Sequence, residues 1–116
     1  MILGELPVHL ATSESADALR DDEAVRTVEI LGAPAGKDEL LDAIALALGF
    51  PDYFGRNWDA LDEALRDVET DRVTALVVRD GARMWSAMPD EMSVLVEVWL
   101  SAAGERGGDL HLVVVW

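Results

Sequence analysis

Two short runs of largely apolar and β-branched residues constrain the fold more than any other feature of this sequence. They are VTALVV, Val73 to Val78, and LHLVVVW, Leu110 to Trp116. Runs this continuous are typical of strands that are covered on both faces. A third run, RTVEIL from Arg26 to Leu31, alternates in polarity and is closed by Gly32. We therefore predict three strands, of which the last two are covered on both faces.

Helical patterns occupy the segments between these strands. In KDELLDAIALALG, apolar residues recur every three or four positions, and Gly49 follows as a natural C-terminal stop. The same spacing recurs after Asn57, which is a candidate N-cap. We predict helices over residues 37–49, 57–68 and 92–103, with one more short helical turn at Ala82 to Met88.

Helical connections between strands imply parallel pairing through right-handed crossovers. The sequence therefore predicts an α/β fold in which a small three-stranded parallel sheet packs against about four helices. The chain has 116 residues, so we expect a single domain, 1–116. Residues 1–24 precede the repeating pattern and are predicted to be an N-terminal extension of a core at 25–116. Within the extension, PVHLA is a weak candidate for an edge strand and ESADALR for a short helix.

Charge narrows the range of partners. The net charge is −14, from 23 acidic and 9 basic residues. Such a charge repels phosphate backbones and anionic membranes, so we expect no direct nucleic-acid binding and no membrane association. A basic protein is the natural partner.

The lack of cysteine and of targeting signals limits the cellular locations that we expect for the protein. The chain has no cysteine, which excludes disulfides and thiolate-ligated zinc. The N-terminus lacks the basic and apolar regions of a signal peptide, and no apolar run is long enough to span a membrane. We expect a cytoplasmic protein that is monomeric when free and holds no cofactor or metal.

The stretch FPDYFGRNWDALDEAL joins an aromatic loop to an acidic helix. Asp59 and Glu63 are four residues apart, so their carboxylates form a row on the predicted helix, which Asp67 continues. Like charges at this spacing cost a few tenths of a kcal/mol per pair, which indicates a helix that is not tuned for stability alone. The alternative interpretation is an ordinary solvated helix face, with acids near the helix start favoured by its dipole.

The aromatic loop contains residues with different expected environments. Phe50 and Trp58 are expected to pack into the core. Tyr53 fits such a corner less well, because a tyrosine hydroxyl in a loop usually needs water or a partner. Gly55 is expected to supply backbone angles that other residues avoid.

The motif aromatic-Gly-x-Asn-aromatic-Asp-Ala-Leu within this stretch resembles the signature of the barstar family, the intracellular inhibitors of secreted guanyl-specific ribonucleases. The resemblance covers about residues 25 to 116 and includes the closing strand from Asp109. It implies a barstar-like fold and a partner-binding face. That face would consist of Tyr53, Phe54, Gly55, Asn57, Asp59, Asp62, Glu63 and Arg66.

The resemblance also implies a mechanism. A ribonuclease that grips phosphate lines its cleft with basic side chains, and a helix bearing Asp59 and Glu63 can place carboxylates there instead. The implied partner is a basic extracellular-type ribonuclease or a ribonuclease-domain toxin. Toward a toxin, the protein would act as an antitoxin or immunity protein.

The sequence departs from the family pattern at several positions of this face. Glu63 stands where the family has its principal aspartate, and Asp62 replaces a tryptophan. Arg56 reverses a glutamate, Arg66 adds a positive charge at the edge, and Ser101 stands where the family has an acid. These departures bear on which ribonuclease the protein binds.

The residues also bear on three other functions. An enzyme is disfavoured, because His9 and His111 are far apart in sequence, His111 is expected in the core, and no phosphate loop or nucleophile elbow occurs. Asp59, Asp62 and Glu63 could bind a divalent cation only weakly, without the oxygen-rich loop of calcium sites. The main alternative is an acidic adaptor of the same fold that binds a basic non-nuclease protein.

Overall fold

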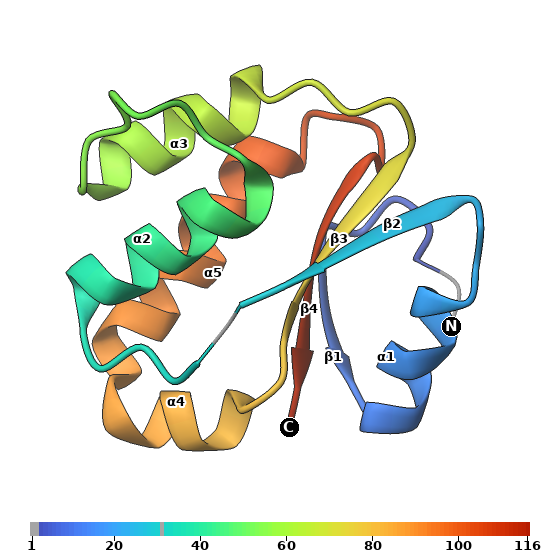
Figure 1. Ribbon diagram of the computed structural model, residues 1–116, viewed down its shortest axis with the longest axis horizontal. Coiled ribbons are helices and arrows are strands. Elements are labelled where there is room, and N and C mark those ends of the chain that lie inside the picture. The colour runs from blue at the N-terminus through green and yellow to red at the C-terminus, as the bar shows by residue number, and fades with distance from the viewer. Residues whose placement is uncertain (1–2, 31) are drawn as a thin grey trace.

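A parallel β-sheet joined by helical crossovers forms the centre of the protein (Figure 1). The computed structural model describes residues 3–30 and 32–116. In chain order, the elements within these residues are β1 (Val8–Ala11), α1 (Ser13–Arg20), β2 (Val25–Glu29), α2 (Lys37–Leu48), α3 (Trp58–Asp67), β3 (Val73–Val78), α4 (Gly81–Ala87), α5 (Pro89–Ala103) and β4 (Leu110–Val115). The strands lie in the order β1–β4–β3–β2, and every neighbouring pair is parallel. The two most apolar strands therefore occupy the centre.

Helices cover both faces of the sheet. Successive residues of a strand point to opposite faces: Leu76 and Val78 of β3 pack with α2, α3, α4 and α5, whereas Ala75 and Val77 pack with α1. Figure 1 shows α1 on the opposite side of the sheet from α2 and α5. This arrangement confirms the prediction that the two apolar strands are covered on both faces.

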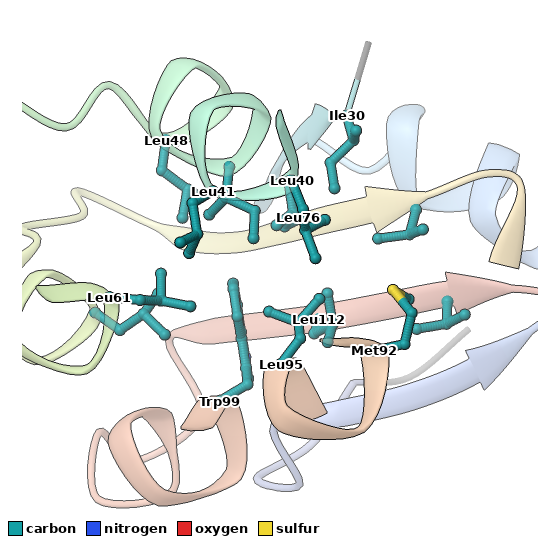
Figure 2. Close-up of a cluster of buried hydrophobic side chains, with 14 of the residues drawn as sticks. Ile30, Leu40, Leu41, Leu48, Leu61, Leu76, Met92, Leu95, Trp99 and Leu112 are labelled. Carbon is teal, nitrogen blue, oxygen red and sulfur yellow. The ribbon is translucent and has the colours of Figure 1, made fainter. Parts of the chain in front are cut away.

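The larger core lies between the sheet and helices α2 to α5. Leu61 of α3, Trp99 of α5 and Leu112 of β4 are fully buried members of this cluster (Figure 2). Leu61 and Leu65 are both inaccessible to solvent, so the apolar face of α3 is oriented as its spacing predicts. The opposite face of α3 is left for solvent or for a partner.

The predicted count of three strands and about four helices is low by one strand and one helix among the described residues. The additional elements are β1 and α1, at the positions of the two weak candidates, PVHLA and ESADALR. The strand has only four residues and its signal in the sequence is weak, because its place depends on pairing with a distant strand, β4. The division of a single domain into an extension, 1–24, and a core, 25–116, stays a prediction.

Element boundaries otherwise agree closely with the sequence patterns. α2 is followed by Gly49 in the left-handed conformation (φ 71°), as a C-terminal stop requires. The short turn predicted before Pro89 is α4. β2 ends at Glu29, and Leu31, the predicted last residue of that strand, lies outside the described residues. Within residues 3–30 and 32–116, no helix has the length and apolar character needed to cross a membrane.

Candidate protein-binding site

Asn57 fixes the start of α3, as its sequence position predicts. Its backbone is extended (φ −145°, ψ 164°), and its Oδ1 accepts a hydrogen bond from the Ala60 amide at 2.7 Å. This bond satisfies one of the amide groups that the first turn of a helix leaves unpaired. Asn57 therefore sets the point at which the aromatic loop ends and the acidic helix begins.

The loop between α2 and α3 directs one aromatic side chain into solvent and the others toward the core. Tyr53 is 89% exposed. The rings of Phe50 and Phe54 are in contact, with centroids 5.2 Å apart. Both rings are partly buried and pack against the larger core, as Trp58 does. The contacts of Phe50 and Trp58 are those predicted for them, and they leave Tyr53 as the aromatic side chain of this loop that is free to meet a partner.

Gly55 allows close packing, and the prediction of unusual backbone angles at this position is wrong. Gly55 is not among the described glycines with positive φ. A Cβ atom there would lie 3.2 Å from Nδ2 of Asn57 and 3.5 Å from Cβ of Ala60. The chain already turns one residue earlier, where the Phe54 amide donates to the Pro51 carbonyl at 3.0 Å. Gly55 thus lets the loop pass close to the first turn of α3.

Asp59, Glu63 and Asp67 form an acid row on the outer side of α3. All three residues are exposed, whereas Leu61 and Leu65 of the same helix are fully buried. Within the described ranges, none of the three carboxylates takes part in an ion pair. The acid row therefore presents uncompensated negative charge.

An open groove of about 330 Å³ lies between the aromatic loop and the acid row. Phe50 and Phe54 line it from the loop, and Ala64 and Val68 line it from α3 and its C-cap. Its lining also includes three polar side chains, Tyr53, Glu63 and Asp67. The groove thus brings together four predicted site residues, Tyr53, Phe54, Gly55 and Glu63. The other four, Asn57, Asp59, Asp62 and Arg66, lie outside its lining. The groove also includes Asp67, which continues the acid row as the i, i+4 spacing from Glu63 predicts.

Asp62 and Arg66, also predicted site residues, do not line this groove. Arg66 Nε donates to Asp62 Oδ2 at 3.1 Å, and Arg66 Nη1 donates to Glu105 Oε2 at 2.8 Å. Arg66 Nη2 donates to Oγ of Ser101 on α5 at 3.2 Å. These contacts raise the pKa of Arg66, chiefly through the hydrogen bond to Asp62. Arg66 therefore connects α3 to α5 and to the residues after it, and Asp62 pairs with Arg66 within α3.

Arg56, the other positive charge near the loop, is likewise neutralised within the protein. Its Nε lies 2.8 Å from Oδ1 of Asp42 on α2, and the two side chains are 60% and 49% exposed. An ion pair this exposed contributes little to stability. Its effect is electrostatic, because a basic partner approaching the groove meets Arg56 together with a compensating carboxylate.

Arg106, which sequence reasoning missed, holds the C-terminal end of α3. Its Nη1 donates to the carbonyl oxygens of Leu65 and Arg66 at 2.9 and 3.1 Å, two groups that a helix end can leave unpaired. Its Nε and Nη2 donate to the two carboxylate oxygens of Asp109 at 2.8 and 2.9 Å. The two hydrogen bonds to α3 link residues about 40 positions apart in the chain, so no local pattern could predict them.

The Arg106–Asp109 pair predicts a loss of stability at acid pH. Hydrogen bonds from Arg106 hold the pKa of Asp109 below its ordinary value of 3.8. Because the folded-state pKa is the lower one, the pair stabilises the protein above that ordinary value. The contribution is lost as the pH falls through the folded-state pKa.

Replacing Asp109 with asparagine tests this contribution. The Asp109 side chain is 39% exposed, so solvent screens the pair, and we expect a loss of about 1 kcal/mol at pH 7. Urea unfolding at pH 7 and pH 3 is the measurement. The variant should lose less stability than the parent between the two pH values, and an identical loss in both proteins would contradict the assignment.

The sequence matches a protein-family model over most of its length. A family model described as Barstar (barnase inhibitor) matches residues 24–115. The matched segment begins just before β2 and includes the aromatic loop, α3, Arg106 and β4, whereas β1 and α1 precede it. A search of curated proteins finds no match.

Proposed function

This chain belongs to the barstar family, and from that membership we propose that it binds a basic guanyl-specific ribonuclease, or the ribonuclease domain of a toxin, and blocks its active-site cleft. The observation that supports the proposal is the groove lined by Tyr53 and Glu63, where the acid row of α3 forms no ion pair with the described residues. A cleft that binds RNA phosphates is lined with cations, and carboxylates are complementary to it. Inhibition in this way makes and breaks no bond.

The residues of the face have different parts in this proposal. Glu63, exposed at the groove, is the principal contact with the basic cleft, and Asp59 extends the acid row toward the start of α3. Tyr53 packs on the partner from the loop. The shape of the loop depends on Phe54, Gly55 and Asn57. The edge of the face depends on Arg66, which α5 holds in place, and on Asp62, which pairs with Arg66.

Capture followed by an inhibition assay tests the function. The immobilised protein is exposed to a lysate and to culture medium, and a captured ribonuclease is then assayed for RNA cleavage with increasing amounts of the free protein. We expect RNA cleavage to stop when the free protein and the ribonuclease are present at a one-to-one ratio. We also expect the free protein to be monomeric and cytoplasmic. Capture of a basic protein without ribonuclease activity would favour the adaptor instead.

Association with the ribonuclease should depend strongly on salt. The net charge of −14 steers a basic partner at low ionic strength, and this attraction is screened over about 10 Å at 0.1 M salt. Raising the salt concentration should therefore slow the association rate steeply and change the dissociation rate much less. Surface plasmon resonance at several salt concentrations measures both rates. A salt-independent association rate would indicate an interface built mainly on the aromatic loop.

A further inference from the structure

The segment of residues 3–11 is joined to β4 at the opposite end of the chain. Its strand β1 pairs in register with β4, from Val8 opposite Leu112 to Ala11 opposite Val115. The Leu112 amide donates to the Pro7 carbonyl at 2.8 Å, just before β1 begins. This segment lies outside the part of the chain that matches the barstar family, so its attachment is not explained by the proposed ribonuclease-binding face.

Two histidines lie at the centre of this attachment. His111 is fully buried, as its apolar strand predicts. Its Nε2 is 2.6 Å from the Gly108 carbonyl oxygen, and its Nδ1 is 3.0 Å from the Leu6 carbonyl oxygen and 2.9 Å from Nε2 of His9. We call this group the histidine clasp: the rings of His9 and His111 with the carbonyl oxygens of Leu6 and Gly108.

The backbone beside the clasp is closely packed. Gly108 has a φ of 90°, and a Cβ atom there would lie 2.7 Å from the Gly4 carbonyl oxygen. A side chain at Gly108 would therefore both strain the backbone and displace the segment of residues 3–11.

Hydrogen-bond chemistry limits the number of protons that the clasp can hold. A carbonyl oxygen only accepts, so His111 Nε2 carries the proton that faces Gly108. One more proton fits between His9 Nε2 and His111 Nδ1, and when His111 Nδ1 carries it the Leu6 carbonyl oxygen can also accept it. If both rings were imidazolium ions, two N–H groups would face each other across 2.9 Å, with two positive charges in contact. The docked clasp therefore accepts one positive charge and excludes the second.

We propose that the histidine clasp is a proton-operated latch, which releases the segment of residues 3–11 from β4 on mild acidification while the remainder of the fold persists. Once the segment is released, the rings of His9 and His111 no longer face each other, so both can carry a positive charge at acid pH. The released state therefore binds one more proton than the docked state at acid pH. A difference of one proton shifts the docking equilibrium about tenfold per pH unit.

The titration of His9 points in the same direction as this geometry. Burial, followed by the proximity of His111, lowers the pKa of His9 below 6.5, and the Leu6 carbonyl opposes that shift. A group whose folded-state pKa is lowered stabilises the docked state above its ordinary pKa. That stabilisation is lost as the pH falls through the folded-state value.

Three carboxylates also lie near the clasp in the structure or in the sequence. Asp22, from the turn after α1, lines a cavity of about 260 Å³ together with His111, and Glu5 precedes Leu6 in the segment itself. Asp109, two residues before His111, is paired with Arg106. Packing of α5 on β1 occurs at the other face of the strand, where Val8 meets the larger core. An ordinary carboxylate changes charge near pH 4, whereas imidazole is the side chain whose ordinary charge change falls between pH 5 and 8.

Amide hydrogen exchange followed by NMR at pH 7.5 and pH 5.5 tests the latch in the whole protein. After correction for intrinsic exchange rates, protection of the Leu112 amide should fall by at least about tenfold at the lower pH. The Ile30 amide, which donates to the Val77 carbonyl at 3.2 Å on the far side of the sheet, is the internal control and should keep its protection. Unchanged protection at Leu112, or an equal loss at both amides, would overturn the proposal.

His9→Gln is the matched variant, because its side-chain amide can turn to donate to His111 Nδ1 or to accept from it but cannot become charged. Protection of the Leu112 amide should then change less than about threefold between the two pH values. A full pH response in this variant would overturn the assignment of the latch to the histidine pair. The experiment needs no ribonuclease, so its outcome is independent of the proposed inhibition.

Discussion

Replacing Glu63 with alanine is expected to weaken binding of the ribonuclease by at least about 2 kcal/mol, roughly 30-fold, while leaving the fold intact. Glu63 is exposed at the groove and contributes no ion pair to the described structure. Its removal should therefore change the free energy of unfolding by less than about 0.5 kcal/mol. Most of the lost affinity should appear as faster dissociation, because the substitution leaves desolvated cationic groups of the partner without a carboxylate.

Glu69→Ala is the control for net charge. Glu69 is exposed, lies beyond the end of α3 at Asp67, and is not part of the groove lining. It removes the same charge from the same region of the chain. Surface plasmon resonance with the captured ribonuclease compares the two variants. Equal and small losses of affinity would mean that the acid row acts only as background charge and that Glu63 has no special part in binding.

Replacing Leu61 with alanine is expected to destabilise the fold by about 2–5 kcal/mol. The Leu61 side chain is inaccessible to solvent and belongs to the cluster that also contains Trp99 (Figure 2). Its truncation removes buried methyl groups and leaves a cavity under α3. Because α3 carries the acid row, the same change should also weaken ribonuclease binding at temperatures near the unfolding transition.

Urea unfolding measures the effect, with Leu46→Ala as the control. Leu46 lies on α2 and is 74% exposed, so the same chemical change should cost less than about 0.5 kcal/mol there. A loss below about 1 kcal/mol for Leu61→Ala would mean that its side chain is not part of the core.

Local patterns in the sequence predict most of the fold, because strands and helix ends depend on neighbouring residues. The apolar runs of β3 and β4 report burial on both faces, Gly49 marks the end of α2, and Asn57 caps α3. Strand β1 was only a weak candidate because four residues carry little periodic signal. Its position is decided by pairing with β4, which no local pattern records.

The candidate site likewise has features that the sequence predicts and features that it does not. The exposure of Glu63 follows from the helical spacing of its neighbours, and the exposure of Tyr53 follows from the need of a loop hydroxyl for water or a partner, so both could be predicted. By contrast, Arg66 reaches Ser101 and Glu105, 35 and 39 residues away, and Arg106 reaches back to α3. Such contacts depend on how helices pack in three dimensions, which is why they escaped sequence analysis.

The position of β4 between β1 and β3 has a consequence for synthesis on the ribosome. This strand is the last element of the described chain, yet it is central in the sheet, and the contact between His9 and His111 spans 102 residues. Neither β1 nor β3 can gain this neighbour until β4 has emerged from the exit tunnel. Closure of so long a loop is slow compared with local folding. A nascent chain that has already displayed the aromatic loop and α3 therefore still lacks the central strand β4, and under the proposed function it should bind the ribonuclease only after β4 is released.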